Sequence, residues 1–222
     1  PVVIGVDRAG VVGDDGPTHH GVFDISFLRA VPNMTILAPR TGGELSAMLS
    51  WGLEQSSPVA IRYPRGDAGA INSEPSFDPR AAIPAEVVKT GGDVMIFAVG
   101  SMVEVALEAA HMLEPEFSCG VVNVRSIKPL DEKLRSLAQG KQCVFTLEDH
   151  VLSGGFGSSV LELLSDDPSV RVECLGYPDT FVPQGGIRRL HEEYGLTEDH
   201  IVLRVRKALS GRPLRVVARK DL

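Results

Sequence analysis

The sequence lacks any apolar run long enough to cross a membrane. No eighteen consecutive apolar residues occur among its 222 residues, which excludes a simple transmembrane helix. Its first ten residues, PVVIGVDRAG, have the pattern of a strand and not the charged and apolar segments of a secretion signal. We therefore expect a soluble protein.

Cysteine is scarce, and its placement favours reduced thiols. The three cysteines each lie inside an apolar, strand-like run: SCGVVNV contains Cys119, QCVFTL contains Cys143 and VECLGY contains Cys174. Free cysteines in such runs behave as small core hydrophobes. Buried, unpaired thiols are typical of a reducing compartment, so we expect a cytoplasmic location.

The chain also lacks the basic excess of a nucleic-acid-binding protein. It has 22 Lys and Arg against 29 Asp and Glu, a formal net charge of −7, which argues against a nucleic-acid partner. The end of the chain is an exception, because residues 204–222 contain seven basic residues and one acid. A solvated helix face and tail explains this run better than a partner-binding site does.

What the sequence does contain is an alternation of strand and helix patterns, which predicts an α/β fold. Strands are expected at residues 2–6, 34–38 and 59–63, with a helix over GGELSAMLSWGLEQS. After a stretch rich in Gly, Ser, Pro and Asp the alternation restarts with DVMIFAVG and continues to a last helix around EDHIVLRVRKALSG. We expect two parallel-rich, three-layer α/β domains at residues 1–68 and 85–222, joined by a linker at residues 69–84.

A glycine-rich loop, Asp7–Asp24, is the best candidate for a functional site. It follows directly on the first strand, where ligands of open α/β sheets bind. Its chemical groups are Arg8, Asp15, His19 and His20. A loop histidine can act as an acid, a base or a hydrogen-bond donor, or it can simply fix the loop backbone. Asp15 could orient the His19 ring or cap the turn at Gly16. A metal site is a poorer interpretation, because neighbouring histidines point in different directions and no Cys or Glu lies at ligand spacing.

The third strand ends in IRYPRG, which places Arg65 beyond the strand end, in the same region as Arg8. Two guanidiniums that converge there, with no excess of acids to neutralise them, favour a phosphate or carboxylate ligand. Separate surface salt bridges are the alternative. Arg62, inside the strand, is either structural or functional.

Other motifs carry weaker signals. SGGFGSS at residues 153–159 precedes a helix and could present amides to an anion, but tight loop packing is the preferred interpretation because neither a complete G-x-G-x-x-G nor a Walker lysine is present. The remaining four histidines are expected to be structural or on the surface: His111, His150, His191 and His200.

GDDGPTHHG followed by LRAVPNMTILAP resembles the pyrimidine-binding domain of the transketolase superfamily. Within it, DRAG after the first strand and IRYPRG after the third resemble the deoxyxylulose-phosphate synthases more than transketolases or 2-oxo acid dehydrogenase β subunits. VRSIKPLD, TLEDH, GGFGSS and LGYPDTFVPQG resemble that family's C-terminal domain. The resemblance covers nearly the whole chain.

The resemblance implies a transketolase-type transferase. Such an enzyme condenses pyruvate with glyceraldehyde 3-phosphate, with loss of CO2, and serves isoprenoid, thiamine and pyridoxal biosynthesis. Thiamine diphosphate supplies the electron sink and Mg²⁺ holds its diphosphate. By position, Arg8 and Arg65 match the arginines that hold the acceptor phosphate, His19 matches a histidine beside the reacting carbons, and Asp15 matches an acidic residue of the same loop. A homodimer is also implied.

Several parts of the family's machinery have no counterpart here. The diphosphate and magnesium motif, its downstream Asn and the glutamate that activates the aminopyrimidine are missing, so we expect a C-terminal portion of the enzyme that is inactive alone. Gln184 in VPQGG departs from the Glu-His pair of many relatives, and little effect on catalysis is expected. The alternatives are a stand-alone interaction or dimerisation module and another transketolase-like thiamine enzyme.

Overall fold

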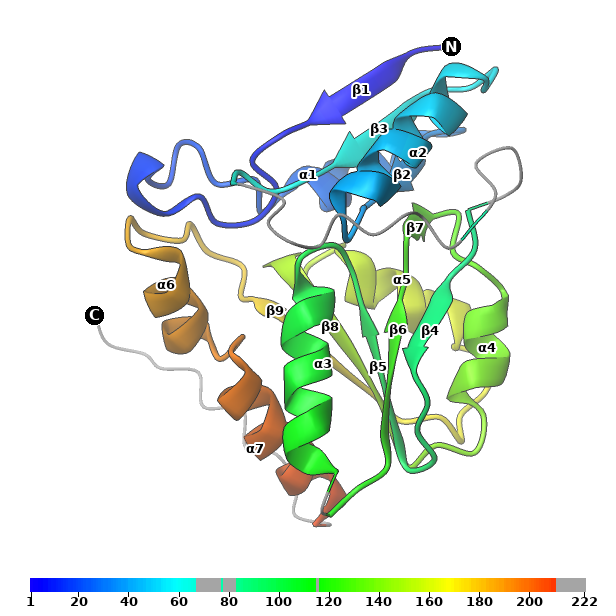
Figure 1. The fold of residues 1–222 in the computed structure, drawn as a ribbon, viewed down its shortest axis with the longest axis vertical. Coiled ribbons are helices and arrows are strands. Elements are labelled where there is room, and N and C mark those ends of the chain that lie inside the picture. The colour runs from blue at the N-terminus through cyan, green and yellow to red at the C-terminus, as the bar shows by residue number, and fades with distance from the viewer. Residues whose placement is uncertain (67–76, 78–82, 115, 211–222) are drawn as a thin grey trace.

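The computed structural model describes residues 1–66, 77, 83–114 and 116–210. Two sheets form the scaffold, one above the other in Figure 1. The first has the strand order β1 (Val3–Val6), β3 (Val59–Arg62), β2 (Thr35–Leu37), β7 (Ser126–Lys128). The second has the order β4 (Glu86–Lys89), β6 (Cys119–Asn123), β5 (Val94–Ala98), β8 (Cys143–Val151), β9 (Val172–Tyr177).

The first sheet places the ends of β1 and β3 side by side. The two strands are parallel, with Val3 opposite Val59 and Val6 opposite Arg62, and β2 runs parallel to β3 on its other side. The segments that follow β1 and β3 therefore leave the sheet at the same edge. This arrangement brings the glycine-rich loop and residues 63–66 to one place.

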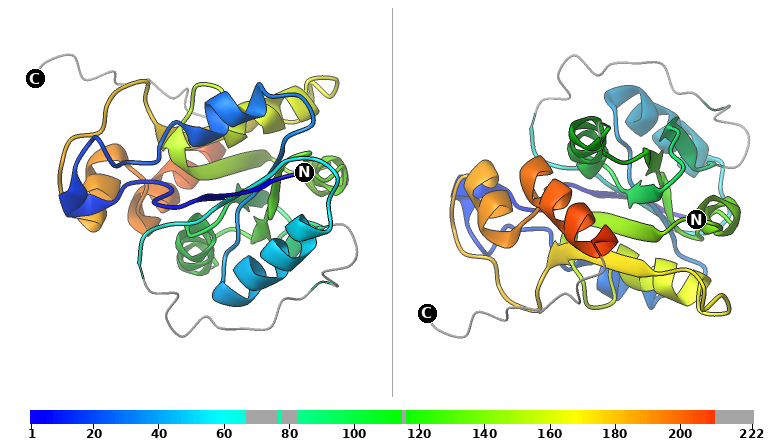
Figure 2. Two further views of the ribbon diagram at one scale, coloured as in Figure 1. Left: turned by 90° about the horizontal axis from the view of Figure 1, so that it is seen from above. Right: turned by 90° about the horizontal axis from the view of Figure 1, so that it is seen from below.

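Alternation along the central strand β5 explains why helices cover both faces of the second sheet. Val94, Ile96 and Ala98 pack in one core cluster with α3 (Met102–Leu113) and α7 (Glu198–Leu209). Met95 and Phe97 point the other way, into a cluster with α4 (Lys133–Ala138) and α5 (Phe156–Leu163). A strand that is apolar at every position fits a sheet buried on both faces. Figure 2 shows the helices on either side of the sheet.

The two faces of the first sheet pack in different clusters. Val59 and Ile61 face α2 (Gly42–Leu53) in a separate cluster. Ala60 faces the other way, into the cluster that contains Ile25 of α1 (Asp24–Arg29) together with α4 and α5. One apolar core therefore extends from the first half of the chain into the second.

The structure confirms the α/β class and most expected elements, and it adds four. A 3-10 turn (Gly13–Asp15) and α1 (Asp24–Arg29) lie between the first two expected strands, where no helix was expected. β4 was not expected, and β7 follows β6 as a separate strand. α7 lies where the last helix was predicted, and α6 (Ile187–Tyr194) belongs to the expected alternation of strands and helices. The proposed linker lies outside the described residues except for residues 77, 83 and 84, as does the basic tail from residue 211.

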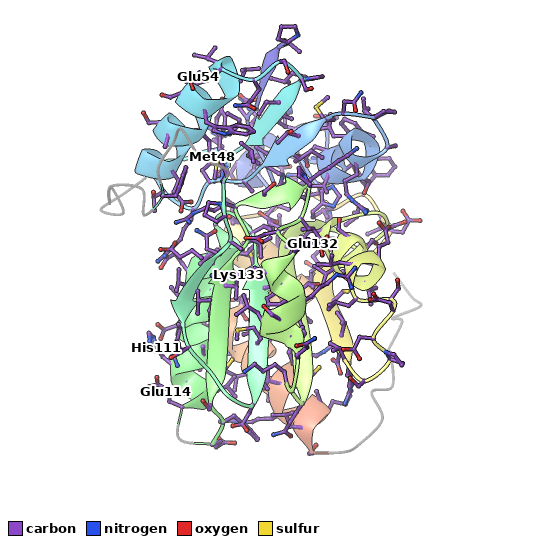
Figure 3. All side chains as sticks on the ribbon, turned by 90° about the vertical axis from the view of Figure 1, so that its right-hand side faces the viewer. Met48, Glu54, His111, Glu114, Glu132 and Lys133 are labelled. Atoms are coloured by element: carbon purple, nitrogen blue, oxygen red, sulfur yellow. The ribbon has the colours of Figure 1, made fainter. Side chains whose placement is uncertain are left out.

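The two halves are joined by β7 and by a buried ion pair. β7 follows the second sheet's β6 in sequence but pairs antiparallel with β2 of the first sheet, with Ile36 opposite Lys128. Arg125, just before β7, contacts Glu44 of α2. In Figure 3, α2 with Met48 and Glu54 lies in the upper half, while His111 and Glu114 mark the far end of α3. Glu132 and Lys133 lie between them, at the start of α4.

The fold bears on two expectations from the sequence: the lack of a membrane-spanning helix and the burial of unpaired cysteines. Within the described ranges, none of the helices has the length and apolarity needed to cross a bilayer. All three cysteines are unpaired; Cys119 and Cys143 are buried and Cys174 is half-buried. Burial raises the pKa of both Cys119 and Cys143 to about 12.

Candidate functional site

The glycine-rich loop leaves β1 through a strained turn. Arg8 has φ 59°, a left-handed conformation that non-glycine residues rarely adopt and that is frequent at functional sites. Two backbone hydrogen bonds hold Arg8 in this conformation: Ala9 N donates to Tyr63 O at 3.0 Å, and Gly21 N donates to Arg8 O at 3.1 Å. The turn therefore fixes where the Arg8 side chain leaves the backbone.

Arg8 and Arg65 converge on one carboxylate. Arg8 Nη1 lies 2.9 Å from Asp15 Oδ2, and Arg65 Nη1 lies 2.5 Å from the same oxygen. All three side chains reach solvent, with exposed fractions of 37% for Arg8, 54% for Arg65 and 25% for Asp15. The structure thus brings the three predicted residues together, and the alternative of two separate salt bridges does not occur.

Asp15 supplies a single acid to the two arginines. It lies between them and offsets one of their two charges, so the three side chains together keep a formal charge of +1. A cavity of about 440 Å³ opens beside them, and its lining includes Asp14, Asp15, Arg65 and the start of α6 at Gly186 and Ile187. This cavity is large enough for a small phosphorylated molecule.

His19 lies on the exposed side of the same loop. Its Nδ1 is 3.0 Å from Thr18 Oγ1, and its backbone N donates to Gly16 O. In the described part of the chain the hydrogen-bond partners of Asp15 are the two arginines, so Asp15 does not orient the His19 imidazole here. The exposed ring is free to meet a ligand from solvent.

His20 fixes the loop backbone. The ring is buried, Val12 N donates to its Nδ1 at 3.0 Å, and its Nε2 lies 3.2 Å from Pro183 O. Since Nδ1 accepts, Nε2 carries the proton and donates to that carbonyl. Of the two interpretations open for a loop histidine, the structural one describes His20.

Arg62 is part of a buried ion pair. Its Nε donates to Asp24 Oδ2 at 2.8 Å, Nη2 reaches Asp24 Oδ1 at 3.3 Å, and the two side chains are 4% and 6% exposed. Arg62 Nη2 also donates to Gly21 O at 3.4 Å. Arg62 therefore ties the end of β3 to the end of the glycine-rich loop at Gly21 and to the first residue of α1, Asp24. Its side chain is buried in these contacts and does not reach the cluster of Arg8, Asp15 and Arg65.

Sequence reasoning missed how the TLEDH segment supports the loop. Three consecutive residues of β8 contact other elements: Glu148 accepts from Phe156 N and Gly157 N at 2.6 and 2.8 Å, Asp149 accepts from Val11 N, and His150 Nε2 accepts from Ile25 N at 3.0 Å. Three consecutive ionisable residues inside a mostly apolar strand were the available signal. Two amides of the SGGFGSS segment, Phe156 N and Gly157 N, therefore donate to a carboxyl group of the chain itself, a partner that the sequence argument did not consider.

Burial shifts the pKa of two of these groups. It lowers the pKa of His150 to about 4, with the nearby Arg62 charge adding to the effect. It raises the pKa of Glu148 to about 8, against the opposing effect of the two amides at the start of α5. His150 is therefore neutral at pH 7, with Nδ1 donating to Val151 O at 2.7 Å.

The described residues do not fit the metal-diphosphate part of a thiamine diphosphate site. Among them there is no group of three or more His, Cys, Asp or Glu side chains that could hold a metal ion. Mg²⁺ prefers carboxylate oxygens as ligands, and the described residues offer no cluster of them. What they do bring together is two guanidiniums and one carboxylate, on a loop that also carries an exposed histidine.

Two family models match the chain. The transketolase pyrimidine-binding domain matches residues 1–69, and the transketolase C-terminal domain matches residues 84–201. Curated relatives include 1-deoxy-D-xylulose-5-phosphate synthase 2 of Geobacter sulfurreducens, 46% identical over 93% of this chain, and the 1-deoxy-D-xylulose-5-phosphate synthase of Heliobacterium modesticaldum, 43% identical over 90%. The chain spans about a third of the length of these relatives, 34% and 32% respectively.

Solved structures give the same fold. One described as a split-gene transketolase, an inactive β4 tetramer, is 34% identical with a TM-score of 0.77, and the match covers 94% of this chain and 67% of that one. A transketolase from Campylobacter jejuni matches 92% of this chain and 31% of its own at 23% identity, with a TM-score of 0.72, which shows the fold alone. The chain belongs to the transketolase family, carrying its pyrimidine-binding and C-terminal domains, and its curated relatives are 1-deoxy-D-xylulose-5-phosphate synthases.

Proposed function

We propose that this chain is part of a 1-deoxy-D-xylulose-5-phosphate synthase, which joins pyruvate to glyceraldehyde 3-phosphate with loss of CO2. The identity of 46% to a synthase over most of the chain supports this. The complete enzyme depends on thiamine diphosphate and Mg²⁺, works in the cytoplasm and forms a homodimer. Residues 1–68 belong to its pyrimidine-binding domain, 69–84 to a linker and 85–222 to its C-terminal domain.

The observation that carries the proposal is the shared carboxylate between Arg8 and Arg65. Asp15 stands in for an anionic ligand, because its single charge bridges two guanidiniums that would otherwise repel each other. A phosphate group carries about −1.5 to −2 charges and three acceptor oxygens, so it bridges the same pair more strongly. We assign Arg8 and Arg65 to the phosphate of glyceraldehyde 3-phosphate, with Asp15 displaced toward His19 when the phosphate binds.

His19 and Asp15 are the proposed catalytic groups of this chain. The aldehyde end of a substrate whose phosphate lies at the arginines extends along the exposed side of the loop, where the His19 ring lies. At that position a neutral imidazole can donate a hydrogen bond, and an imidazolium a proton, to the aldehyde oxygen as it gains charge. Asp15, released from the arginines, can accept a hydrogen bond from the His19 ring and orient it.

The phosphate assignment is tested by Arg65→Met in the complete synthase. Loss of one charge-assisted contact raises the KM for glyceraldehyde 3-phosphate about 10- to 100-fold, while the KM for pyruvate changes less than twofold. Arg135→Met is the matched control, since Arg135 pairs with Glu132 and Asp166 on the α4 side of the molecule. An unchanged KM for the phosphorylated aldehyde contradicts the assignment.

We further propose that the 222-residue polypeptide has no synthase activity by itself. The solved relative that is described as an inactive β4 tetramer of a split-gene transketolase supports this, because the match covers 94% of this chain. The test is turnover of pyruvate and glyceraldehyde 3-phosphate by the purified polypeptide with added thiamine diphosphate and Mg²⁺. We expect none, and measurable product overturns this part of the proposal.

A further inference from the structure

Asp149, in the C-terminal half of the chain, contacts the glycine-rich loop directly. Its Oδ2 accepts a hydrogen bond from Val11 N at 3.3 Å, and its Oδ1 accepts one from Tyr177 OH at 2.7 Å. His191 Nε2 lies 3.6 Å from Oδ1. The side chain is buried, so the carboxylate is held on one side by β9 and α6 and presents its other oxygen to the loop.

The loop is shaped to accept this carboxylate. A Cβ atom at Gly10 would lie 1.7 Å from Asp149 Oδ2, far inside van der Waals contact. Gly10 also has φ 78°, which disfavours any side chain. Only glycine at position 10 allows the Asp149 carboxylate to reach the Val11 amide, three residues after the strained turn at Arg8.

Two more contacts hold the loop to the same half of the chain. The buried His20 ring links Val12 N to Pro183 O, and Gln184 Nε2 donates to Asp14 O at 2.9 Å. Within the loop, a 3-10 turn and the bridges of Gly21 to Ala9 and Gly10 are the only regular structure. The contacts with the second half of the chain therefore hold the part between them, from Val11 to His20. The expectation that Gln184 would matter little did not anticipate that it contacts the residue beside Asp15.

We propose that Asp149 is a positioning residue for the acceptor-phosphate site: it fixes the loop backbone at Gly10 and Val11 so that Arg8 and Asp15 meet Arg65. This inference rests on the proposed function. Arg65 follows β3 and Arg8 follows β1, so both leave the first sheet at the same edge, whereas the loop backbone from Gly10 to Asp15 takes its place from its contacts with the second half of the chain. A displacement of about 1 Å between the groups that bind a substrate can cost on the order of 100-fold in rate, so the anchor matters even though Asp149 touches no substrate.

The test compares Asp149 variants in the complete synthase. Asp149→Ala raises the KM for glyceraldehyde 3-phosphate at least tenfold and leaves the KM for pyruvate within twofold. Asp149→Asn keeps an acceptor oxygen for Val11 N and a donor for Tyr177 OH, so it restores most of the lost affinity. Gly10→Ala, which pushes the loop off an intact Asp149, raises the same KM as Asp149→Ala does.

Two controls separate positioning from general loss of stability. Val205→Ala truncates a buried residue of α7 in the core cluster that also contains Val11 and Tyr177. We expect it to lose about as much stability as Asp149→Ala and to leave both KM values unchanged. Gly140→Ala repeats the left-handed strain of Gly10 (φ 72°) at a position with nothing within 4 Å of the new Cβ. It shows the cost of strain without the clash, and its KM values also remain unchanged.

A second measurement does not depend on catalysis. Hydrogen exchange of the amides in residues 9–14 is faster by at least tenfold in Asp149→Ala, but not in Val205→Ala. Unchanged exchange, or faster exchange with an unchanged acceptor KM, overturns the positioning role. If Arg65→Met has no effect on the acceptor KM, the proposed function fails, and the exchange rates alone decide whether Asp149 holds the loop.

Discussion

The guanidinium of Arg125 lies against the carboxylate of Glu44, with 2.5 Å between Nε and Oε1, and the two side chains come from opposite halves of the chain. Glu44 also accepts from Arg40 N and from Asn123 Nδ2, and Thr41 Oγ1 accepts from Glu44 N as the cap of α2. One buried carboxylate therefore ties the segment before α2 to the second half of the chain.

Glu44→Gln is expected to lower the free energy of unfolding by about 3 kcal/mol. Removing one partner of a buried ion pair leaves the other charge without full compensation, although Arg125 keeps Glu86 at 2.6 Å. Urea unfolding measures the loss. The matched control is Glu54→Gln, at the exposed end of α2 (Figure 3); an equal loss in both variants contradicts the role of the pair.

His150 gives the protein a pH-dependent stability. Its folded pKa is lowered to about 4 by burial, from about 6.5 in the unfolded chain. A group with a lowered folded pKa stabilises the fold above its unfolded pKa, and this contribution is lost as the pH falls from about 6.5 toward about 4. Between pH 7 and pH 4.5 the His150 contribution falls by on the order of 2 kcal/mol.

Glu148 acts with the opposite sign over an overlapping range. Because its folded pKa is raised to about 8, its stabilising contribution is present at low pH and is lost as the pH rises toward 8.

The measurement that isolates His150 is a comparison of the free energy of unfolding of the protein and of His150→Gln at pH 7 and pH 4.5. The variant loses less stability on acidification, whereas the exposed His111→Gln control follows the parent protein. Parallel losses in all three proteins argue against the buried neutral imidazole.

The raised thiol pKa values predict slow chemical modification. Burial raises the pKa of Cys119 and Cys143 to about 12, and the thiolate is the reactive form. Ellman's reagent at pH 8 should therefore modify neither residue in the folded protein, and should modify all three cysteines in urea. Rapid labelling of Cys119 or Cys143 without denaturant contradicts the packing described above.

In the proposed site Asp15 competes with the acceptor phosphate for the two arginines, so we expect its removal to have opposite effects on binding and catalysis. In the complete synthase, Asp15→Ala lowers the KM for glyceraldehyde 3-phosphate several-fold, since the arginines no longer have an internal partner, and it lowers kcat because His19 loses its acidic neighbour. Steady-state kinetics measure both constants. A higher KM in Asp15→Ala contradicts the competition.

Much of the fold followed from the sequence because strand and helix periodicity are local properties. The run VMIFA predicted a strand buried on both faces, and T-G-G-E at residues 41–44 carries the pattern of a helix start. β7 was not predictable in this way, since its three residues continue β6 in sequence but pair with β2 across the junction of the halves. Pairing of that kind depends on tertiary packing.

The candidate site was predictable where its residues follow strand ends. Arg8 and Arg65 were placed together because β1 and β3 are parallel neighbours. The sequence did not reveal that Asp15 lies between them. It also did not reveal that Asp149 holds the loop and His150 the start of α1, because these two contacts join residues more than a hundred positions apart. Long-range hydrogen bonds leave little local pattern in a sequence.

The central claim is that Arg8 and Arg65 bind the acceptor's phosphate, and the most direct test compares glyceraldehyde 3-phosphate with unphosphorylated glyceraldehyde. In the complete synthase, the ratio of kcat/KM for the two aldehydes should fall at least 100-fold in the Arg8→Met/Arg65→Met double variant, with activity toward glyceraldehyde itself nearly unchanged. If both aldehydes lose activity equally and the ratio stays constant, the two arginines do not recognise the phosphate and the account is contradicted.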